Sequence, residues 1–140
     1  GIKRLGLEKY IVENLNRDTF LPAPGQGAIA IESLKENELL NKFLSKINHE
    51  KSYLCTDAER IFMSRIGGGC HMPFGCFAQI NNSEITIVGM ISSIKNFDIV
   101  RKSITGKIKD YKKLSKKLAK EITQGNGQKI MSEFKNISID

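Results

Sequence analysis

Residues 74–91 read FGCFAQINNSEITIVGMI, and their pattern is the clearest indication of secondary structure in the chain. Apolar positions recur at every second residue on both sides of a polar turn, Asn81-Asn82-Ser83. Such alternation is typical of two half-buried strands joined by a tight hairpin. The first strand places Phe74, Cys76, Ala78 and Ile80 on one face, and the second places Ile85, Ile87, Gly89 and Ile91 there. A third strand is expected around Ile99–Ile104, which predicts a three-stranded antiparallel sheet.

Helical patterns flank this sheet on both sides. Residues 50–66 predict a helix with Leu54, Ala58, Ile61 and Phe62 facing inward, ended by the glycines 67–69 through a left-handed cap. Asp110 is a plausible N-cap for a helix that carries Tyr111, Leu114, Leu118 and Ile122 on one face and ends at Gly125. A last short helix carries Ile130, Met131 and Phe134. Residues from about 50 onward are therefore predicted to form an α+β unit with its own hydrophobic core.

The N-terminal third has a different character. Residues 1–15 predict an amphipathic helix, Ala28–Ile31 a buried strand and residues 39–47 a second helix. Gly1 opens in the middle of a helical pattern, so we expect the chain to be a fragment. The overall fold class is α/β, in which a helix-strand-helix remnant of larger N-terminal α/β domains precedes the α+β domain.

Composition limits the classes of protein to consider. The 140 residues are 40% hydrophobic and 26% charged, with a net charge of +7, as expected for a globular chain. No apolar run reaches the length of a membrane span, and no secretory signal is visible. An odd number of cysteines, three, favours reduced thiols and a cytoplasmic location.

The densest group of chemically capable residues is AERIFMSRIGGGCHMPFGCFAQ, residues 58–79. Cys70 follows three glycines between a helix and a strand, where free amide donors and a compliant backbone let a large ligand approach. It could equally be a small hydrophobic residue that fills a loop. A zinc site is a further alternative, but the available residues have no C-x2-C spacing, and we expect no metal. Its ligands would come from His49, Cys55, Cys70, His71 and Cys76.

Two motifs carry a resemblance to a known family. Glu59-Arg60, Arg65-Ile66, Gly68-Gly69-Cys70, Pro73 and Gly75 closely match the cofactor-attachment signature of the porphobilinogen deaminase (hydroxymethylbilane synthase) family. LPAPGQGAIAIE, residues 21–32, looks like the second signature of that family, and GIKRLGLE, residues 1–8, resembles its preceding helix. Met72 stands where the family usually has a β-branched residue.

The resemblance implies an enzyme of tetrapyrrole and heme biosynthesis. Such a transferase condenses four porphobilinogen molecules into hydroxymethylbilane and releases ammonia each time. The growing chain is covalently attached to a dipyrromethane cofactor, and a thioether joins this cofactor to the cysteine that matches Cys70. A soft sulfur nucleophile suits the electrophilic methylene carbon that ammonia loss creates, and a thioether resists hydrolysis.

The resemblance also assigns residues. Gly69 belongs to the cofactor loop with Cys70, and Gln26 and Gly27 match the segment that crosses between domains near the cofactor. Arg4 aligns with an arginine that binds the substrate carboxylates, for which a guanidinium is well suited; the residues alone favour a solvated helix position. Arg60 fits the pattern too, or could form a surface ion pair beside Glu59. Nothing corresponds to the catalytic aspartate of the family, so no catalytic residue is assigned.

By the same resemblance, residues 1–18 would finish domain 2, residues 19–48 would return to domain 1, and residues 49–140 would form domain 3 with the cofactor cysteine. The partners are then porphobilinogen and its oligomers. The full-length protein is expected to be a monomer, whereas the fragment would self-associate and would be inactive alone.

A binding module is the competing class. KIKDYKKLSKKLAKEI, residues 107–122, predicts a basic amphipathic helix that could lie on nucleic acid or on an anionic membrane. The alternative is a domain-packing helix with a solvated, lysine-rich face, which we favour. We therefore expect neither nucleic acid nor membrane as a partner.

Overall fold

A computed structural model describes residues 1–67 and 72–135 of the chain. Three strands form the sheet: β1 (Phe74–Asn81), β2 (Glu84–Ser92) and β3 (Ile99–Lys107). They pair antiparallel in chain order, with Ala78 opposite Ile87 and Ile87 opposite Ile104. Asn82 has a positive φ of 53° in the first hairpin, a conformation that asparagine tolerates better than most residues. The antiparallel sheet and the α+β class are confirmed.

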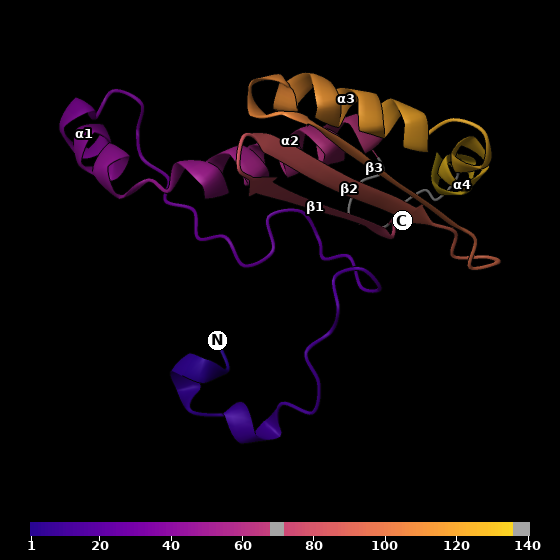
Figure 1. Cartoon of the computed structure of the whole chain (residues 1–140), viewed down its shortest axis with the longest axis horizontal. Coiled ribbons are helices and arrows are strands. Elements are labelled where there is room, and N and C mark those ends of the chain that lie inside the picture. Colours follow the sequence, from indigo (N-terminus) through magenta and orange to yellow (C-terminus); the bar gives the residue numbers. More distant parts are fainter. Residues whose placement is uncertain (68–71, 136–140) are drawn as a thin grey trace.

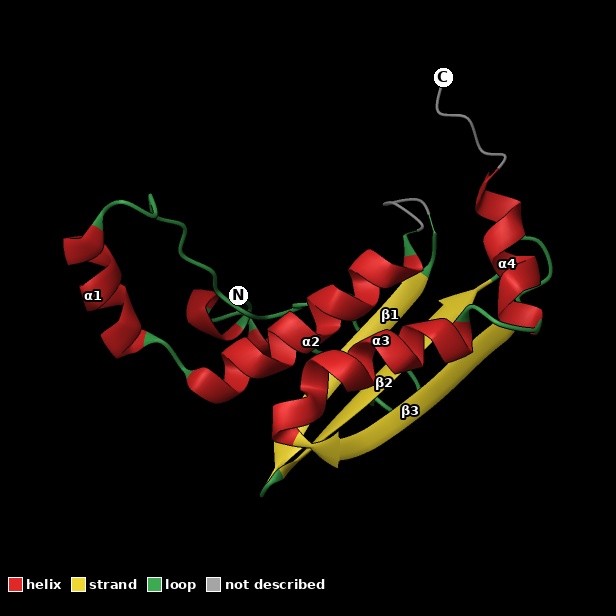
Figure 2. Ribbon diagram, turned by 90° about the horizontal axis from the view of Figure 1, so that it is seen from above, coloured by secondary structure: helices red, strands yellow, loops and turns green. Residues whose placement is uncertain are grey.

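Helices cover one face of this sheet (Figures 1 and 2). They are α2 (Glu50–Ile66), α3 (Tyr111–Ile122) and, at the end of the sheet, α4 (Asn126–Lys135). The core lies between the two layers and includes the fully buried Phe62, Ile87, Leu118 and Ile122. Because strand residues point alternately to the two faces, the helix layer buries only one of them.

The helix boundaries follow the sequence closely. α2 spans the predicted residues, and Gly67 ends it in the left-handed conformation with φ 68°, as expected. α3 begins directly after Asp110, although the Asp110 side chain makes no capping hydrogen bond. It ends at Ile122, three residues before Gly125, which instead takes a positive φ in the turn to α4.

Residues 1–48 differ from the prediction in two of their three elements. The expected helix over residues 1–15 is wrong: only the 3-10 turns Lys3–Leu5 and Glu8–Tyr10 form, separated by Gly6 at φ 67°. The expected strand Ala28–Ile31 is also wrong, and Ile29 is 94% exposed. A short helix needs a packing surface and a strand needs a neighbour, and neither contacts these segments here.

The third N-terminal element is confirmed as α1 (Glu38–Ile47). The Asn37 side chain caps it by accepting a hydrogen bond from the Leu40 amide at 3.1 Å. Its apolar face is nevertheless open to solvent, with Leu39 69% and Ile47 68% exposed. The helix is thus capped locally, whereas its amphipathic face has no packing partner among the described residues.

Candidate functional site

The two motif stretches meet at the outer edge of β1. Residues 16–27, called here the crossing segment, pass under the sheet to this edge (Figure 1), where Pro22 and Gly25 are hydrogen-bonded. The Cys76 amide donates to the Pro22 carbonyl at 3.0 Å, and the Gly25 amide donates to Glu59 Oε2 at 2.6 Å. Sequence positions 54 and 34 residues apart thus meet in one site.

Gly75 explains why the crossing segment approaches so closely. A Cβ at this position would lie 3.0 Å from the Leu21 carbonyl oxygen and 3.1 Å from the Leu21 Cβ. Any side chain would therefore push the segment away from the strand. This assigns a packing reason to a glycine that the signature motif contains, which spacing alone did not provide.

Gly25 and Gly27 shape the turn itself. They have φ values of 73° and 83°, in the left-handed region that favours glycine. Two successive turns result, in which the Gln26 amide donates to the Ala23 carbonyl and the Ala28 amide donates to the Gly25 carbonyl. Gln26 and Gly27 are consequently exposed at the tip of a defined turn.

Glu59 is the central polar residue of this site, and its importance was not predicted. It is only 5% exposed, and its second oxygen, Oε1, accepts a hydrogen bond from the Ala78 amide at 2.7 Å. Burial raises the pKa of the carboxyl, while the hydrogen bonds from Gly25 and Ala78 act in the opposite direction. The interpretation of Glu59 as part of a surface ion pair with Arg60 is wrong, because Glu59 is buried and bonded to backbone amides.

A pocket of about 270 Å³ lies between the turn and α2. Gln26 and Gly27 line it from the turn, and Lys51, Cys55 and Glu59 line it from the helix. These helix residues span positions 51–59 of α2, whereas Cys70 follows the C-terminal end of the helix. The signature residues that contact the strand immediately after the cysteine loop are Leu21 and Pro22.

Cys70 and Gly69 lie outside the described residues, as does His71. The structure fixes both ends of the stretch that contains them. The Gly67 amide donates to the Met63 carbonyl at the end of α2, and the Ser92 amide donates to the Pro73 carbonyl at 2.9 Å. Met72, the departure from the family pattern, is buried and belongs to the core.

The other two thiols have surroundings that do not favour reaction. Cys76 is fully buried, and burial followed by the charge of Glu59 raises its pKa strongly. Cys55 is half-buried, and burial likewise raises its pKa. Since the thiolate is the nucleophile, neither described cysteine suits alkylation.

The alternative of a metal site gains no residues from the structure. His49 caps the start of α2, with its Nδ1 2.8 Å from the Ser52 hydroxyl. Over residues 1–67 and 72–135, no group of three or more His, Cys, Asp or Glu side chains could hold a metal ion.

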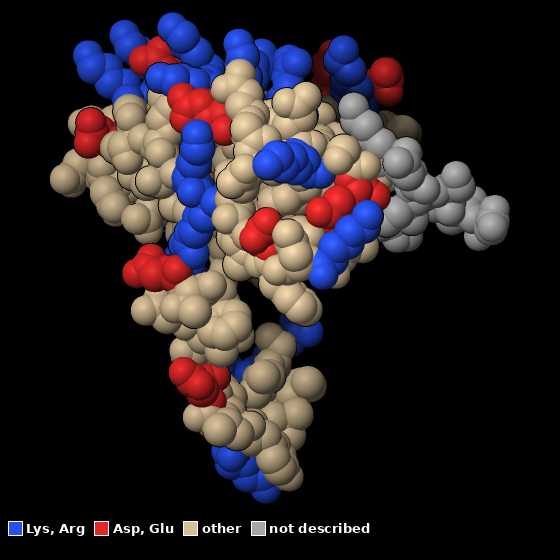
Figure 3. All heavy atoms as spheres, turned by 90° about the vertical axis from the view of Figure 1, so that its right-hand side faces the viewer, with Lys and Arg blue, Asp and Glu red and all other residues tan. Residues whose placement is uncertain are grey.

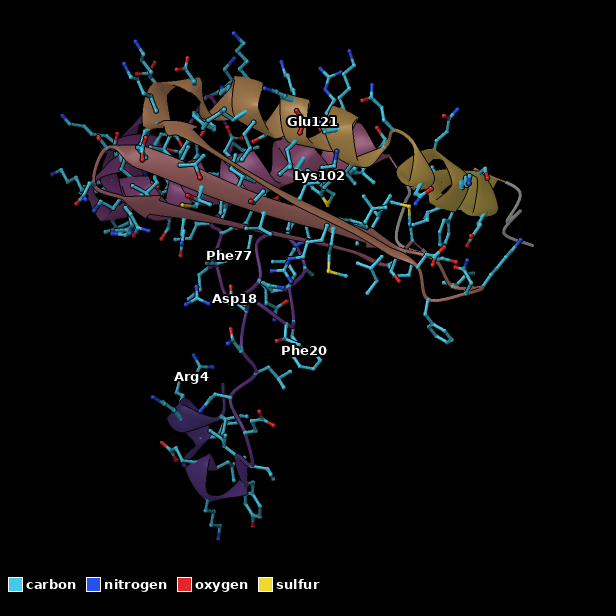
Figure 4. All side chains as sticks on the ribbon, turned by 45° about the vertical axis from the view of Figure 1, so that its right-hand side comes forward. Arg4, Asp18, Phe20, Phe77, Lys102 and Glu121 are labelled. Atoms are coloured by element: carbon cyan, nitrogen blue, oxygen red, sulfur yellow. The ribbon has the colours of Figure 1, made fainter. Side chains whose placement is uncertain are left out.

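Arg4 lies apart from this site. It is exposed in the first 3-10 turn, and Figure 4 shows it near the N-terminus, well below the sheet. On the open face of the sheet, by contrast, the Arg17 guanidinium stacks 4.6 Å from the centre of the Phe77 ring. Arg101 donates to the backbone carbonyls of Arg17 and Asp18, so this face also holds the crossing segment.

The basic helix is confirmed as a packing element. α3 buries Tyr111, Leu118 and Ile122 against the sheet and α2, so its apolar face is not available to a membrane. Its lysines gather along the top of the molecule (Figure 3). Within the described residues, no helix is long and apolar enough to cross a membrane.

Fold and site together define a small α+β domain, to whose sheet edge a segment from the preceding chain is fastened. A family model described as "Porphobilinogen deaminase, C-terminal domain" matches residues 53–124, and one described as "Porphobilinogen deaminase, dipyromethane cofactor binding domain" matches residues 1–42. The chain belongs to the porphobilinogen deaminase family.

Curated relatives agree with this assignment. The chain is 33% identical over 139 residues to the porphobilinogen deaminase of Natranaerobius thermophilus, covering 96% of this chain and 45% of that protein. It is 36% identical to the porphobilinogen deaminase of Geotalea daltonii, over 95% of this chain and 42% of the relative. For that of Clostridium novyi the identity is 38%, over 85% of this chain and 41% of the relative. The chain thus spans less than half the length of these relatives.

Proposed function

We propose that this chain is the C-terminal part of a hydroxymethylbilane synthase, the transferase that polymerises four porphobilinogen molecules with release of ammonia. The observation that carries the proposal is the match of both family models, in the right order, to one chain of 140 residues. Their meeting point is a defined contact, Gly25 to Glu59. The parent protein would be a cytoplasmic monomer that binds porphobilinogen and its oligomers.

The proposal includes a division of the chain among three domains. Residues 1–18 would finish domain 2, residues 19–48 would return to domain 1, and residues 49–140 would form domain 3. Support comes from burial: the large apolar residues of the first 48 positions are mostly exposed, whereas the C-terminal unit has its own core. Segments that pack against absent domains have this appearance.

The chain's residues fit a dipyrromethane cofactor through their chemistry. Alkylation requires an accessible sulfur, and burial disfavours the thiolate at Cys55 and Cys76. Cys70 would therefore form the thioether, with Gly69 beside it. When bound, the cofactor supplies the primer to which pyrrole units are added.

Other residues would bind and orient. Gln26 and Gly27 present backbone and amide groups at the tip of the turn, where they can hydrogen-bond the cofactor. The Arg4 guanidinium would bind a carboxylate of the substrate chain, since each pyrrole carries an acetate and a propionate. No residue of this chain is proposed as the acid or base of the reaction, and the chain alone is expected to be inactive.

Denaturing mass spectrometry of the full-length parent with peptide mapping tests the proposal. We expect a mass increase of two pyrrole units on the peptide that contains Cys70. A Cys70→Ser variant should lose the adduct, whereas a matched Cys55→Ser variant should keep it. Unmodified Cys70 in active enzyme, or an adduct on Cys55 or Cys76, would contradict the proposal.

A further inference from the structure

β1 is an edge strand, and two of its outward-facing amides find partners outside the sheet. The Cys76 amide donates to the Pro22 carbonyl of the crossing segment, and the Ala78 amide donates to Glu59 on α2. The helix and the crossing segment therefore share the covering of this edge, which would otherwise be open to pairing with another strand.

Glu59 differs from Pro22 because its side chain holds two elements at once. One carboxylate oxygen accepts from Ala78 in the strand at 2.7 Å, and the other accepts from Gly25 in the turn at 2.6 Å. The Ala78 and Gly25 amides are both donors, so the side chain between them must supply two acceptor atoms. A carboxylate does so, whereas a glutamine amide offers one acceptor and one donor.

We propose that Glu59 is a positioning residue, which fixes the turn with Gln26 and Gly27 against the domain that carries Cys70. The proposal rests on the function proposed above for the role of those two residues in holding cofactor. Gly25 directly precedes them and has a φ of 73°, a conformation that glycine adopts without steric cost. The position of the turn tip relative to the domain is thus set by the Glu59 carboxylate.

The turn, rather than the strand, is the element that moves when Glu59 is altered. Ala78 is held by its pairing with Ile87 along the β1–β2 ladder. The turn's remaining hydrogen bonds, Gln26 to Ala23 and Ala28 to Gly25, are internal to it and do not attach it to the domain. Its nearest other attachment is Pro22, three residues before Gly25.

Glu59→Gln in the 140-residue chain tests this, with Glu50→Gln as the matched control. Glu50 lies on the same helix, is exposed, and loses the same charge on substitution. Amide hydrogen exchange followed by NMR should show the Gly25 amide exchanging about 10- to 150-fold faster in Glu59→Gln, the loss expected for a hydrogen bond to a charged acceptor. Amides of Ile87 and Ile91 in the central strand should be unchanged, as should every amide in the control.

The outcomes separate positioning from a general loss of stability. Unchanged exchange at Gly25, or equal acceleration across β2, would overturn the proposal. If Glu59→Gln does not fold, Gly25→Ala replaces it: a side chain at this positive φ displaces the turn while the Glu59–Ala78 bond remains. Faster amide exchange over residues 25–28, with the Ala78 amide still protected, supports the proposal. Loss of protection at residues 25–28 and at Ala78 together contradicts it.

The link to function is measured in the parent enzyme. Turnover of porphobilinogen should fall at least tenfold in Glu59→Gln and remain unchanged in Glu50→Gln. A mobile turn with full turnover would overturn the positioning role. A wild-type parent without deaminase activity would instead refute the proposed function, and the exchange measurement would still decide whether Glu59 fixes the turn.

Discussion

Gly89 provides the sharpest test of the packing between sheet and helices. A Cβ added there would lie 2.5 Å from Phe62 Cζ, 2.6 Å from Phe62 Cε2 and 3.0 Å from Ile122 Cδ1. Carbon atoms normally approach to about 3.5–4.0 Å, so the Phe62 ring must retreat by roughly 1 Å. Both neighbours are fully buried and have no solvent to move into.

The expected cost follows from two opposing terms. Overpacking a well-filled core costs about 1–3 kcal/mol, while replacing a strand glycine by alanine returns about 0.5–1 kcal/mol of chain entropy. An approach of 2.5 Å places the overpacking cost in the upper half of its range, about 2–3 kcal/mol, so Gly89→Ala should lower the free energy of unfolding by about 1–2.5 kcal/mol. With a urea slope of about 1–3 kcal/mol/M, the midpoint measured by circular dichroism should fall by roughly 0.3–2.5 M.

A control and a rescue identify the cause. Gly106→Ala meets the flexible end of Leu114 at 3.0 Å and should change stability by less than about 0.5 kcal/mol. Phe62→Leu removes the two ring atoms that clash, so the double variant should lose less than the sum of the single losses, by about 1 kcal/mol. A wild-type midpoint for Gly89→Ala, or additive losses with Phe62→Leu, would show that the ring does not limit the space.

Three further predictions concern the site and the N-terminal segment. Arg4→Ala in the full-length protein should weaken binding of the pyrrole carboxylates by roughly 10- to 150-fold without affecting folding, and normal turnover at subsaturating porphobilinogen would mean that Arg4 is merely solvated. Burial, and next the 2.7 Å hydrogen bond to Asp57, raises the pKa of Tyr111 to about 12 from its usual 10. Because the phenol loses its proton at lower pH in the unfolded chain, the stabilisation from protonated Tyr111 is fully present below pH 10 and is lost as the pH rises through 12. Urea titrations of Tyr111→Phe at alkaline pH should lack that loss of stability. Light scattering should show the 140-residue chain self-associating and residues 50–140 remaining monomeric and folded, because the exposed apolar residues lie mainly before position 48; a monomer at high concentration with residues 26–32 protected from exchange would refute this.

Local signals were sufficient for the C-terminal unit. Alternation from Phe74 to Ile91 specified both strands and their faces, because one face is buried against helices within the same chain. The glycines after Ile66 specified the end of α2, since a left-handed cap depends only on adjacent residues. Patterns of this kind need no knowledge of distant parts of the molecule.

The N-terminal patterns failed for the complementary reason. The apolar spacing of residues 1–15 and the run Ala28–Ile31 describe how these segments pack when a partner is present, and the described residues supply none. The role of Glu59 was missed because nothing in the sequence distinguishes a buried acceptor from an exposed acid on a helix. Only the approach of Gly25 and Ala78 from two other elements identifies it.

The chain-order pairing of β1, β2 and β3 also determines when each part of the molecule assembles. Both hairpins and the contacts of α2 with β1 join neighbours in the sequence, and such short-range contacts form rapidly. The bond between Gly25 and Glu59 joins residues 34 positions apart and requires α2, on which Glu59 lies. We therefore expect the crossing segment to attach late in folding, and interactions that form late govern the rate of unfolding more than the rate of folding. The strength of the Gly25–Glu59 bond should therefore determine how long the crossing segment stays attached, whereas the two hairpins determine the rate of folding.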